Sequence, residues 1–341
     1  MGELRTEPTP DGVPPDPLLA AVQTAVLAPP AQRPDVWSGV EAAAQEARGR
    51  RAWSALADAA EMLARLGESD ADARERAVAL VTPVVASQLI DRLRAPDTSP
   101  ARREALRSVL PALGPEVEEA LLQALRDEAV DPATDHGRRR ALLGAVAEMA
   151  DRGSDILVRM AAEPDWRVAR NAAQMLGERG GPEVLARLRP LTRHPDARVR
   201  REALSGLART GEDEVGVLAK VLLEDPDVGV RVQAARTVGL LGVGLAVRPL
   251  IALLEREEDA GVVQEALRAL GMLGDPAAVP ALERLTSGSL LSRGSQEARV
   301  AAYRALGAIG SPRALELVRD ALADRDAEVR RTAQAVLGPD A

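Results

Sequence analysis

The second half of the chain repeats one pattern of polar and apolar positions six times. In each unit a polar residue, aspartate in five units and Ser295 in the other, stands three positions before an apolar residue. Further apolar residues follow at four and eight positions, and the six sets are Val168, Ala172 and Leu176; Val199, Ala203 and Leu207; Val230, Ala234 and Val238; Val262, Ala266 and Leu270; Ala298, Ala302 and Leu306; Val329, Ala333 and Leu337. Residues at this spacing share one face of a helix, so each unit predicts an amphipathic helix.

Polar residues and glycines mark the ends of each predicted helix. An aspartate at the start can accept hydrogen bonds from the unpaired N–H groups of the first turn, and the aspartates in this position are Asp165, Asp196, Asp227, Asp259 and Asp326. A glycine twelve positions after the first apolar residue is expected to end five of the helices, at Gly180, Gly211, Gly242, Gly274 and Gly310. A glycine nine positions after it is expected to let a neighbouring helix approach closely, at Gly177, Gly239, Gly271, Gly307 and Gly338.

A second apolar stretch follows each of the first five helices, at residues 184–191, 215–223, 247–254, 279–285 and 314–322. We expect the first of these stretches to kink or end early at Pro190, because proline cannot continue a helix without losing a hydrogen bond. The six units begin 31, 31, 32, 36 and 31 residues apart. A fixed period of this length is typical of a solenoid. The pattern therefore predicts an all-α fold, a right-handed α-solenoid (superhelix) of stacked antiparallel helix pairs.

Weaker patterns organise the rest of the chain. Residues 1–16 are polar and Pro-rich, which predicts a disordered arm. We expect residues 17–70 to form helices that cap the array, residues 71–153 to form degenerate helical repeats, and residues 154–341 to form the regular array. The three capping helices are predicted to run from Pro17, capped by Asp16, to a point before Pro29; from Asp35 to Arg48; and from Arg51 to Leu66, closed by a left-handed Gly67.

Two segments between helices, residues 127–137 and 286–296, are longer than their counterparts. Insertions in a solenoid fall in loops on one side of the array and often carry contacts. The alternative is neutral drift in length, because loops tolerate insertion with little loss of stability.

The repeated units resemble a known family. The combination Asp-x-x-Val-Arg and Ala-x-x-Ala-Leu-Gly, with a partner helix such as Ala278–Leu285, is similar to HEAT repeats of the short bacterial type first described in phycobilisome lyases. Asp196–Arg200 and Asp326–Arg330 match best, whereas Val263 replaces the arginine of the fourth unit. The resemblance is clearest over residues 155–338. It implies that the aspartates and arginines link neighbouring repeats and so define a fold and not a catalytic site.

Composition narrows the class of protein. The chain has no Cys, which excludes disulfides and thiolate chemistry and fits a reducing cytoplasm, where we expect the protein to act. The net charge is −8 although 28% of the residues are charged, which argues against a surface that binds nucleic acid everywhere. No run of 18 apolar residues exists, so no membrane span is expected. Lys220 is the only lysine, which indicates a GC-rich coding bias, typical of bacteria.

The usual motifs of catalysis are missing from the sequence. There is no G-x-x-x-x-G-K-[ST] loop, no H-E-x-x-H and no G-x-S-x-G. His136 follows Asp131 and Asp135, but a solvated loop histidine is the simpler interpretation of that group. His194 lies among arginines, which would repel a metal cation. We therefore predict no catalytic, metal-binding or cofactor-binding residues, and a protein that is not an enzyme.

One charged segment stands out. Between Leu185 and Arg201 six arginines face a single carboxylate, that of Asp196, and these arginines are Arg187, Arg189, Arg193, Arg198, Arg200 and Arg201. The next stretch, residues 212–227, is acidic. In a solenoid such blocks become adjacent stripes, so this basic band is a candidate docking surface. The alternative is that the arginines pair with carboxylates of neighbouring repeats, leaving a small net field.

These patterns favour a non-catalytic scaffold that binds another protein through an extended solenoid surface, with the basic and acidic bands side by side. A nucleic-acid-binding protein similar to the DNA glycosylases built on HEAT-like repeats is one alternative, for which Trp166 offers a suitable residue type. A bilin lyase or chaperone is another, by analogy of fold alone. The last repeat lacks its second helix, so self-association through that end is also open.

Overall fold

The computed structural model describes residues 16–130, 136–151, 155–181, 183–211, 213–287 and 295–338. Within these ranges every regular element is a helix and there is no strand. The chain divides into two compact units, Met1–Val168 and Ala169–Ala341. The prediction of an all-α solenoid of stacked helix pairs is confirmed. The predicted divisions at residues 16, 70 and 153, and the hand of the superhelix, stay predictions.

The first unit contains nine helices in the described residues and the start of a tenth. They are α1 (Pro17–Leu27), α2 (Arg33–Gly49), α3 (Trp53–Leu66), α4 (Ala71–Leu80), α5 (Pro83–Arg94), α6 (Pro100–Val109), α7 (Pro115–Val130), α8 (His136–Asp151) and α9 (Ile156–Ala161), with short 3-10 turns at Pro30–Gln32 and Leu110–Ala112. Helix α3 packs against α1, α4 and α5, and α5 packs against α7 and α8. Leu56 and Leu63 of α3 are fully buried, so this helix forms the centre of the unit's apolar core.

The structure confirms the predicted start and end of α1 and the predicted end of α3 at Leu66, and it corrects the predicted starts of α2 and α3. The Asp16 carboxylate accepts a hydrogen bond from the Leu18 N–H at 2.9 Å, as expected of a cap. Helix α2 begins at Arg33, two residues before Asp35. Helix α3 begins at Trp53, because Arg51 takes a positive φ of 55° that a helix cannot contain.

The predicted left-handed conformation of Gly67 is wrong. Gly67 has a φ of −64°, in the right-handed region. A Cβ at this position would lie 2.9 Å from the Cα of Arg74, at the point where α4 passes the end of α3. Glycine is therefore needed at position 67 because a side chain would collide with α4, and not because the backbone there is left-handed.

The second unit is a series of helix pairs. After α10 (Trp166–Arg179) the helices are α11 (Val184–Leu188), α12 (Ala197–Ala208), α13 (Asp213–Leu222), α14 (Val228–Leu240), α15 (Val247–Arg256), α16 (Ala260–Leu273), α17 (Val279–Thr286), α18 (Gln296–Ile309), α19 (Pro312–Asp320) and α20 (Ala327–Leu337), with 3-10 turns at Arg189–Arg193, Gly244–Ala246, Pro276–Ala278 and Ala321–Ala323. Helix α11 gives way to a 3-10 turn after Leu188, which confirms the effect predicted for Pro190.

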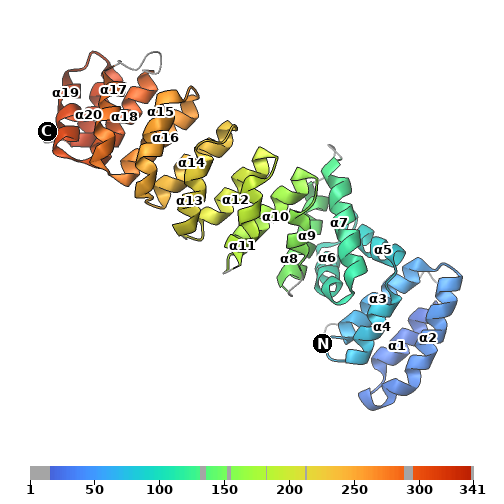
Figure 1. The fold of residues 1–341 in the computed structure, drawn as a ribbon. Helices are drawn as coiled ribbons and strands as arrows, with labels where there is room; N and C mark the ends of the chain where they lie inside the picture. The colour runs from blue at the N-terminus through green and yellow to red at the C-terminus, as the bar shows by residue number, and fades with distance from the viewer. Residues whose placement is uncertain are drawn as a thin grey trace. The chain divides into compact units, whose positions relative to one another are not determined.

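The pairs form two layers. From α12 to α20 each even-numbered helix packs against the next even-numbered one, and the odd-numbered helix of each pair packs against the even-numbered helix that follows it. Figure 1 shows the helices of this unit following one another in chain order from α11 to α20. We call the two sets the even-numbered layer and the odd-numbered layer.

The repeated apolar positions supply the core of this unit. In α12 the three positions of the stripe, Val199, Ala203 and Leu207, are all fully buried, and the same holds for Val262, Ala266 and Leu270 in α16. Full burial of one Leu or Val side chain stabilises the fold by about 1.5–3 kcal/mol, so the stripes hold the pairs together.

The repeated glycines have the two uses that their positions predict. The glycines twelve positions after the first apolar residue, at 180, 211, 242, 274 and 310, have φ between 66° and 71°, the left-handed conformation of a helix C-cap. Of the glycines nine positions after it, Gly177, Gly239, Gly271 and Gly307 face the next even-numbered helix. The close approach predicted at Gly338 is wrong, because nothing lies within 4 Å of a Cβ there. A Cβ on Gly239 would lie 2.9 Å from the Cα of Ala269, and a Cβ on Gly271 would lie 3.1 Å from the Cα of Ala305.

Replacing Gly239 with Ala should destabilise the protein, because the new methyl group would meet the backbone of α16 at Ala269 and force the two helices apart. We expect a loss of about 1–3 kcal/mol in the free energy of unfolding, measured by urea denaturation followed by circular dichroism. Gly244→Ala is the control, since nothing lies within 4 Å of a Cβ there, and it should change stability by less than about 0.5 kcal/mol. Equal effects of the two variants would contradict the role given to Gly239.

Candidate interaction surface

The five aspartates of the repeat pattern lie at the first residue before an even-numbered helix. Each carboxylate accepts a backbone hydrogen bond from the first turn, over 2.7–3.0 Å, from the N–H groups of Arg167, Arg198, Val230, Val262 and Glu328 for Asp165, Asp196, Asp227, Asp259 and Asp326 respectively. The side chain of Arg198 also hydrogen-bonds Asp196, and this contact, more than any other, lowers the pKa of that carboxyl to about 2. These carboxylates hold the helix starts in place.

A buried ion pair links the repeats that contain α12 and α14. Arg200, one residue after the first apolar residue of α12, donates two hydrogen bonds to Asp225, from Nε at 2.8 Å and from Nη2 at 2.7 Å. Its Nη1 donates to the carbonyl oxygens of His194 and Pro195, both at 2.9 Å. The planar guanidinium thereby joins the loop before α12 to the loop before α14.

The next junction repeats this arrangement. Arg231 donates from Nε and Nη2 to Glu257 at 2.7 and 3.0 Å, and from Nη1 to the carbonyl oxygens of Asp225 and Pro226. Burial alone would raise the pKa of Glu257, whose side chain is 6% exposed, but hydrogen bonds from Arg231 and from the Asp259 and Glu258 N–H groups outweigh burial. The pKa of Glu257 is therefore lower than its ordinary value, and the group is a charged structural partner and not a proton donor at neutral pH.

The inter-repeat ion pair is present or absent as a whole. Arg299 and Asp324, 2.5 Å apart, form it at the junction of α18 and α20. The two remaining junctions have neither partner in the sequence. At one of them Ala169 stands at the arginine position and His194 at the acidic position. At the other these positions hold Val263 and Arg293, and Arg293 lies outside the described residues. No junction has one partner of the pair without the other. A lone buried carboxylate would be strongly destabilising, which explains why the two positions change together.

The arginine of this pair is predicted from the sequence pattern above, whereas the acid is not. The signal was available, because the residue two positions before the capping aspartate is acidic wherever the preceding unit has the arginine, as in Asp225, Glu257 and Asp324. The acid at the same place in the first unit, Glu163, is held instead by Arg126 of α7, whose Nη2 and Nε lie 2.6 and 2.9 Å from its two oxygens.

Arg231→Met should lower the free energy of unfolding by about 3–5 kcal/mol, because it leaves the buried Glu257 carboxylate without its main partner. Arg231→Met combined with Glu257→Met should cost less than Arg231→Met alone, since no buried charge then remains unpaired. Urea denaturation of the wild type, the two single variants and the double variant measures this. A double variant that loses the sum of the two single losses would contradict the coupling.

Glu257→Gln should remove part of the pH dependence of stability. Since the pKa of Glu257 is lower in the folded protein than its ordinary 4.5, the carboxylate contributes stability that is complete above pH 4.5 and is lost as the pH falls through the folded value. The wild type should therefore be more stable than Glu257→Gln at neutral pH, and the difference should shrink as the pH falls below 4.5. Thermal unfolding across this range measures it, and a difference that is constant with pH would contradict the assignment.

Most of the six arginines of the predicted basic band are paired. Arg187 pairs with Glu183, Arg189 with Glu214, Arg198 with Asp196 and Arg200 with Asp225. The two others, Arg193 and Arg201, are exposed and make no ion pair with any residue that the structure describes. Four of the six charges are thus balanced locally, and the surface field of the band rests on Arg193 and Arg201.

Two other residues singled out in the sequence, His194 and Trp166, have structural contacts. His194 accepts a hydrogen bond at Nδ1 from the Asp196 N–H at 3.0 Å. The Arg167 guanidinium lies over the Trp166 ring, 5.1 Å from its centroid. The side chain of His136 lies outside the described residues. Among the residues that the structure describes, no three His, Cys, Asp or Glu side chains are grouped as a metal would require.

A groove of about 710 Å³ lies on the even-numbered layer between α16 and α18. Small residues of α18, namely Ala301, Ala305 and Ala308, line it together with Gly271 of α16. Longer side chains, including Arg268, Met272 and Arg304, complete its lining. The groove is not predicted from the sequence, because it arises only when two neighbouring helices present their exposed faces side by side.

Comparison with known proteins agrees with this architecture. A family model of HEAT repeats matches residues 154–216, 215–289 and 288–338, which together are more than half of the chain. The chain therefore belongs to the HEAT-repeat proteins, and the predicted resemblance is confirmed. No curated protein sequence matches it significantly. Within the described ranges, no helix combines the length and the apolar composition needed to cross a bilayer.

Several solved structures have a similar arrangement of helices. The complex of CpcE and CpcF of phycocyanin lyase from Nostoc sp. PCC7120 is 24% identical over 54% of this chain and 75% of that one, with a TM-score of 0.40. An engineered protein is 20% identical over 94% of this chain and 98% of that one, with a TM-score of 0.41. Kap121p is 13% identical over 94% of this chain and 39% of its own length, with a TM-score of 0.45.

Proposed function

We propose that this protein is a non-catalytic scaffold that binds another protein through the exposed surface of its repeats. The observation that carries the proposal is the contrast between the junctions of the second unit and its exposed faces. At the junctions, the buried carboxylates of Asp225 and Glu257 are paired with arginines and held there by backbone hydrogen bonds. On the exposed faces, arginines and apolar side chains are left in contact with water.

Chemistry by these buried groups is disfavoured. A catalytic carboxyl that exchanges protons near neutral pH needs a raised pKa, whereas the pKa of Glu257 is lowered. Arg200 and Arg231 each donate to two carbonyl oxygens besides their carboxylate, which leaves little of the guanidinium to bind a substrate. Stacked repeats instead provide a long surface whose shape and charge can recognise a partner.

The N-terminal helices extend this proposal. We assign residues 17–70 to a cap of the array and residues 71–153 to degenerate repeats, with the regular array following from residue 154. The longer segments 127–137 and 286–296 fall partly outside the described residues, at 131–135 and 288–294. Their proposed role is as loops at the edge of the binding surface, with neutral drift as the alternative.

Within the basic band, Arg193 and Arg201 are the proposed contacts for a partner of complementary charge. Arg193→Glu combined with Arg201→Glu should abolish capture of at least one protein from a lysate of the source cells, because it reverses the two unpaired charges and leaves the ion pairs of Arg187 and Arg189 intact. Affinity capture followed by mass spectrometry measures this. Arg248→Glu, a reversal at an exposed site on α15, is the matched control.

Two outcomes of this experiment are informative in different ways. Capture that is unchanged by the double reversal would remove the basic band as a docking surface. An unrelated solenoid of equal net charge serves as the reference bait. If the wild-type protein captures no protein that this reference does not also capture, the scaffold proposal itself is contradicted.

A further inference from the structure

Three arginines occupy the same place on three neighbouring helices of the even-numbered layer. Arg236 of α14, Arg268 of α16 and Arg304 of α18 each stand six residues after the first apolar residue of their unit. Helix α14 packs directly against α16, and α16 against α18. All three side chains are exposed. The equal register places them in a row that crosses the three helices, and we call this the arginine row.

The arginine row keeps an excess of positive charge. Oε1 of Glu265 lies 3.3 Å from Nε of Arg236 and 3.0 Å from Nε of Arg268, so one carboxylate serves two arginines. Burial alone would raise the pKa of Glu265, but hydrogen bonds from Arg268 and Arg236 lower it, so this group is ionised. Arg304 makes no ion pair with any residue that the structure describes. The row therefore presents three positive charges against one negative charge.

Exposed apolar side chains run beside the arginine row. Leu240 of α14 is 57% exposed and Met272 of α16 is 45% exposed, and both stand one helical turn after the arginine of their helix. The sulfur of Met272 lies 3.5 Å from Nη1 of Arg268, so the charged and apolar lines touch. Next to them lies the groove between α16 and α18, lined by Ala305 and Ala308. Large exposed apolar side chains beside arginines are typical of a binding surface.

We propose that the arginine row, with Leu240 and Met272, binds an extended acidic segment of a partner protein. This inference rests on the scaffold function proposed above and names the chemistry of one partner. Neighbouring packed helices are about 8–10 Å apart. A polyproline II segment rises about 3.1 Å per residue and brings every third side chain to one face, about 9.3 Å apart. An acidic residue at every third position can therefore meet each arginine in turn, with an apolar residue after it directed to the Leu240 and Met272 line.

The surroundings of the arginine row favour an acidic peptide over nucleic acid. Glu297 and Glu328 also line the groove, about two helical turns before the level of the row, and Glu265 lies within it. Duplex DNA carries about one phosphate per 1.7 Å of its axis and would bring further negative charge against these carboxylates. A peptide with widely spaced acidic residues avoids them.

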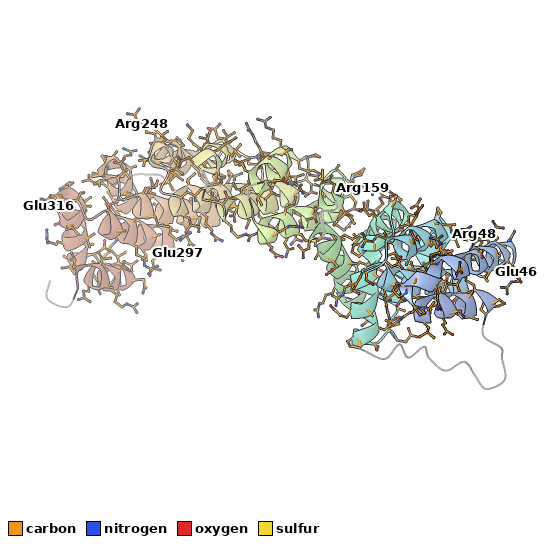
Figure 2. The ribbon with its side chains drawn as sticks, turned by 90° about the horizontal axis from the view of Figure 1, so that it is seen from below. Glu46, Arg48, Arg159, Arg248, Glu297 and Glu316 are labelled. Atoms are coloured by element: carbon orange, nitrogen blue, oxygen red, sulfur yellow. The ribbon has the colours of Figure 1, made fainter. Side chains whose placement is uncertain are left out.

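The test uses the full chain and a fluorescein-labelled peptide of three Glu-Leu-Pro repeats, with binding followed by fluorescence anisotropy. Arg304→Gln should weaken binding about fivefold, because it removes a charge-assisted contact without leaving a carboxylate unpaired. Adding Arg236→Gln should weaken binding further. Arg248→Gln is the matched control and should leave the affinity unchanged, because Arg248 projects from the opposite edge of the unit to Glu297 of the groove, as Figure 2 shows.

A peptide of the same composition with its three Glu residues consecutive should bind less tightly than the spaced peptide. Equal affinity for the two peptides, equal binding by wild type and Arg304→Gln, or tighter binding of duplex DNA than of the spaced peptide would each overturn the proposal. Circular dichroism of each variant verifies the fold. If partner proteins are still captured from lysate and the Arg236→Gln/Arg304→Gln variant captures them equally, the scaffold function stands and only this inference fails.

Discussion

Each helix pair of the second unit depends on its neighbours to cover an apolar stripe that water would otherwise contact. The stripe is built from Val, Ala and Leu, and the chain contains no Phe at all. Because the stripe itself has no large rings to fill space, adjacent helices approach closely, and glycines such as Gly239 face the backbone of the next helix. Stability in such an array is the sum of the pairs and of the contacts between neighbours, so each junction matters locally.

The inter-repeat ion pairs determine the register in which neighbouring repeats pack, which apolar contacts alone do not specify. Apolar stripes of similar residues can slide past one another with little change in free energy, whereas the Arg231 guanidinium meets both Glu257 and two carbonyl oxygens in only one register. The junctions without an arginine, at Ala169 and Val263, also lack the acid, so no buried charge is left unpaired there. Register at those junctions depends on close packing, as between Gly271 and Ala305, and on other polar contacts. Arg209 donates a hydrogen bond to the carbonyl oxygen of Gly177, and Arg284 forms an exposed ion pair with Glu255.

The same repeat supplies both the fold and the proposed function. Because every unit places its stripe, cap and glycines alike, side chains at the remaining positions are free to differ and fall into rows across the layer. In this chain one such position carries Arg236, Arg268 and Arg304 in three successive units. A row of this kind needs no pocket of its own, since its spacing is that of the helices beneath it.

The sequence alone determined the helices, their capping aspartates, the left-handed glycines and the break at Pro190, because these depend on hydrogen bonds and steric contacts within a few residues. It could not decide the use of Gly67, which the approach of Arg74 from another helix settles. Nor could it show that Arg200 meets Asp225, or that one carboxylate, Glu265, lies between two arginines of adjacent helices. Those contacts join residues of different repeats, and only the register in which the helices stack brings them together.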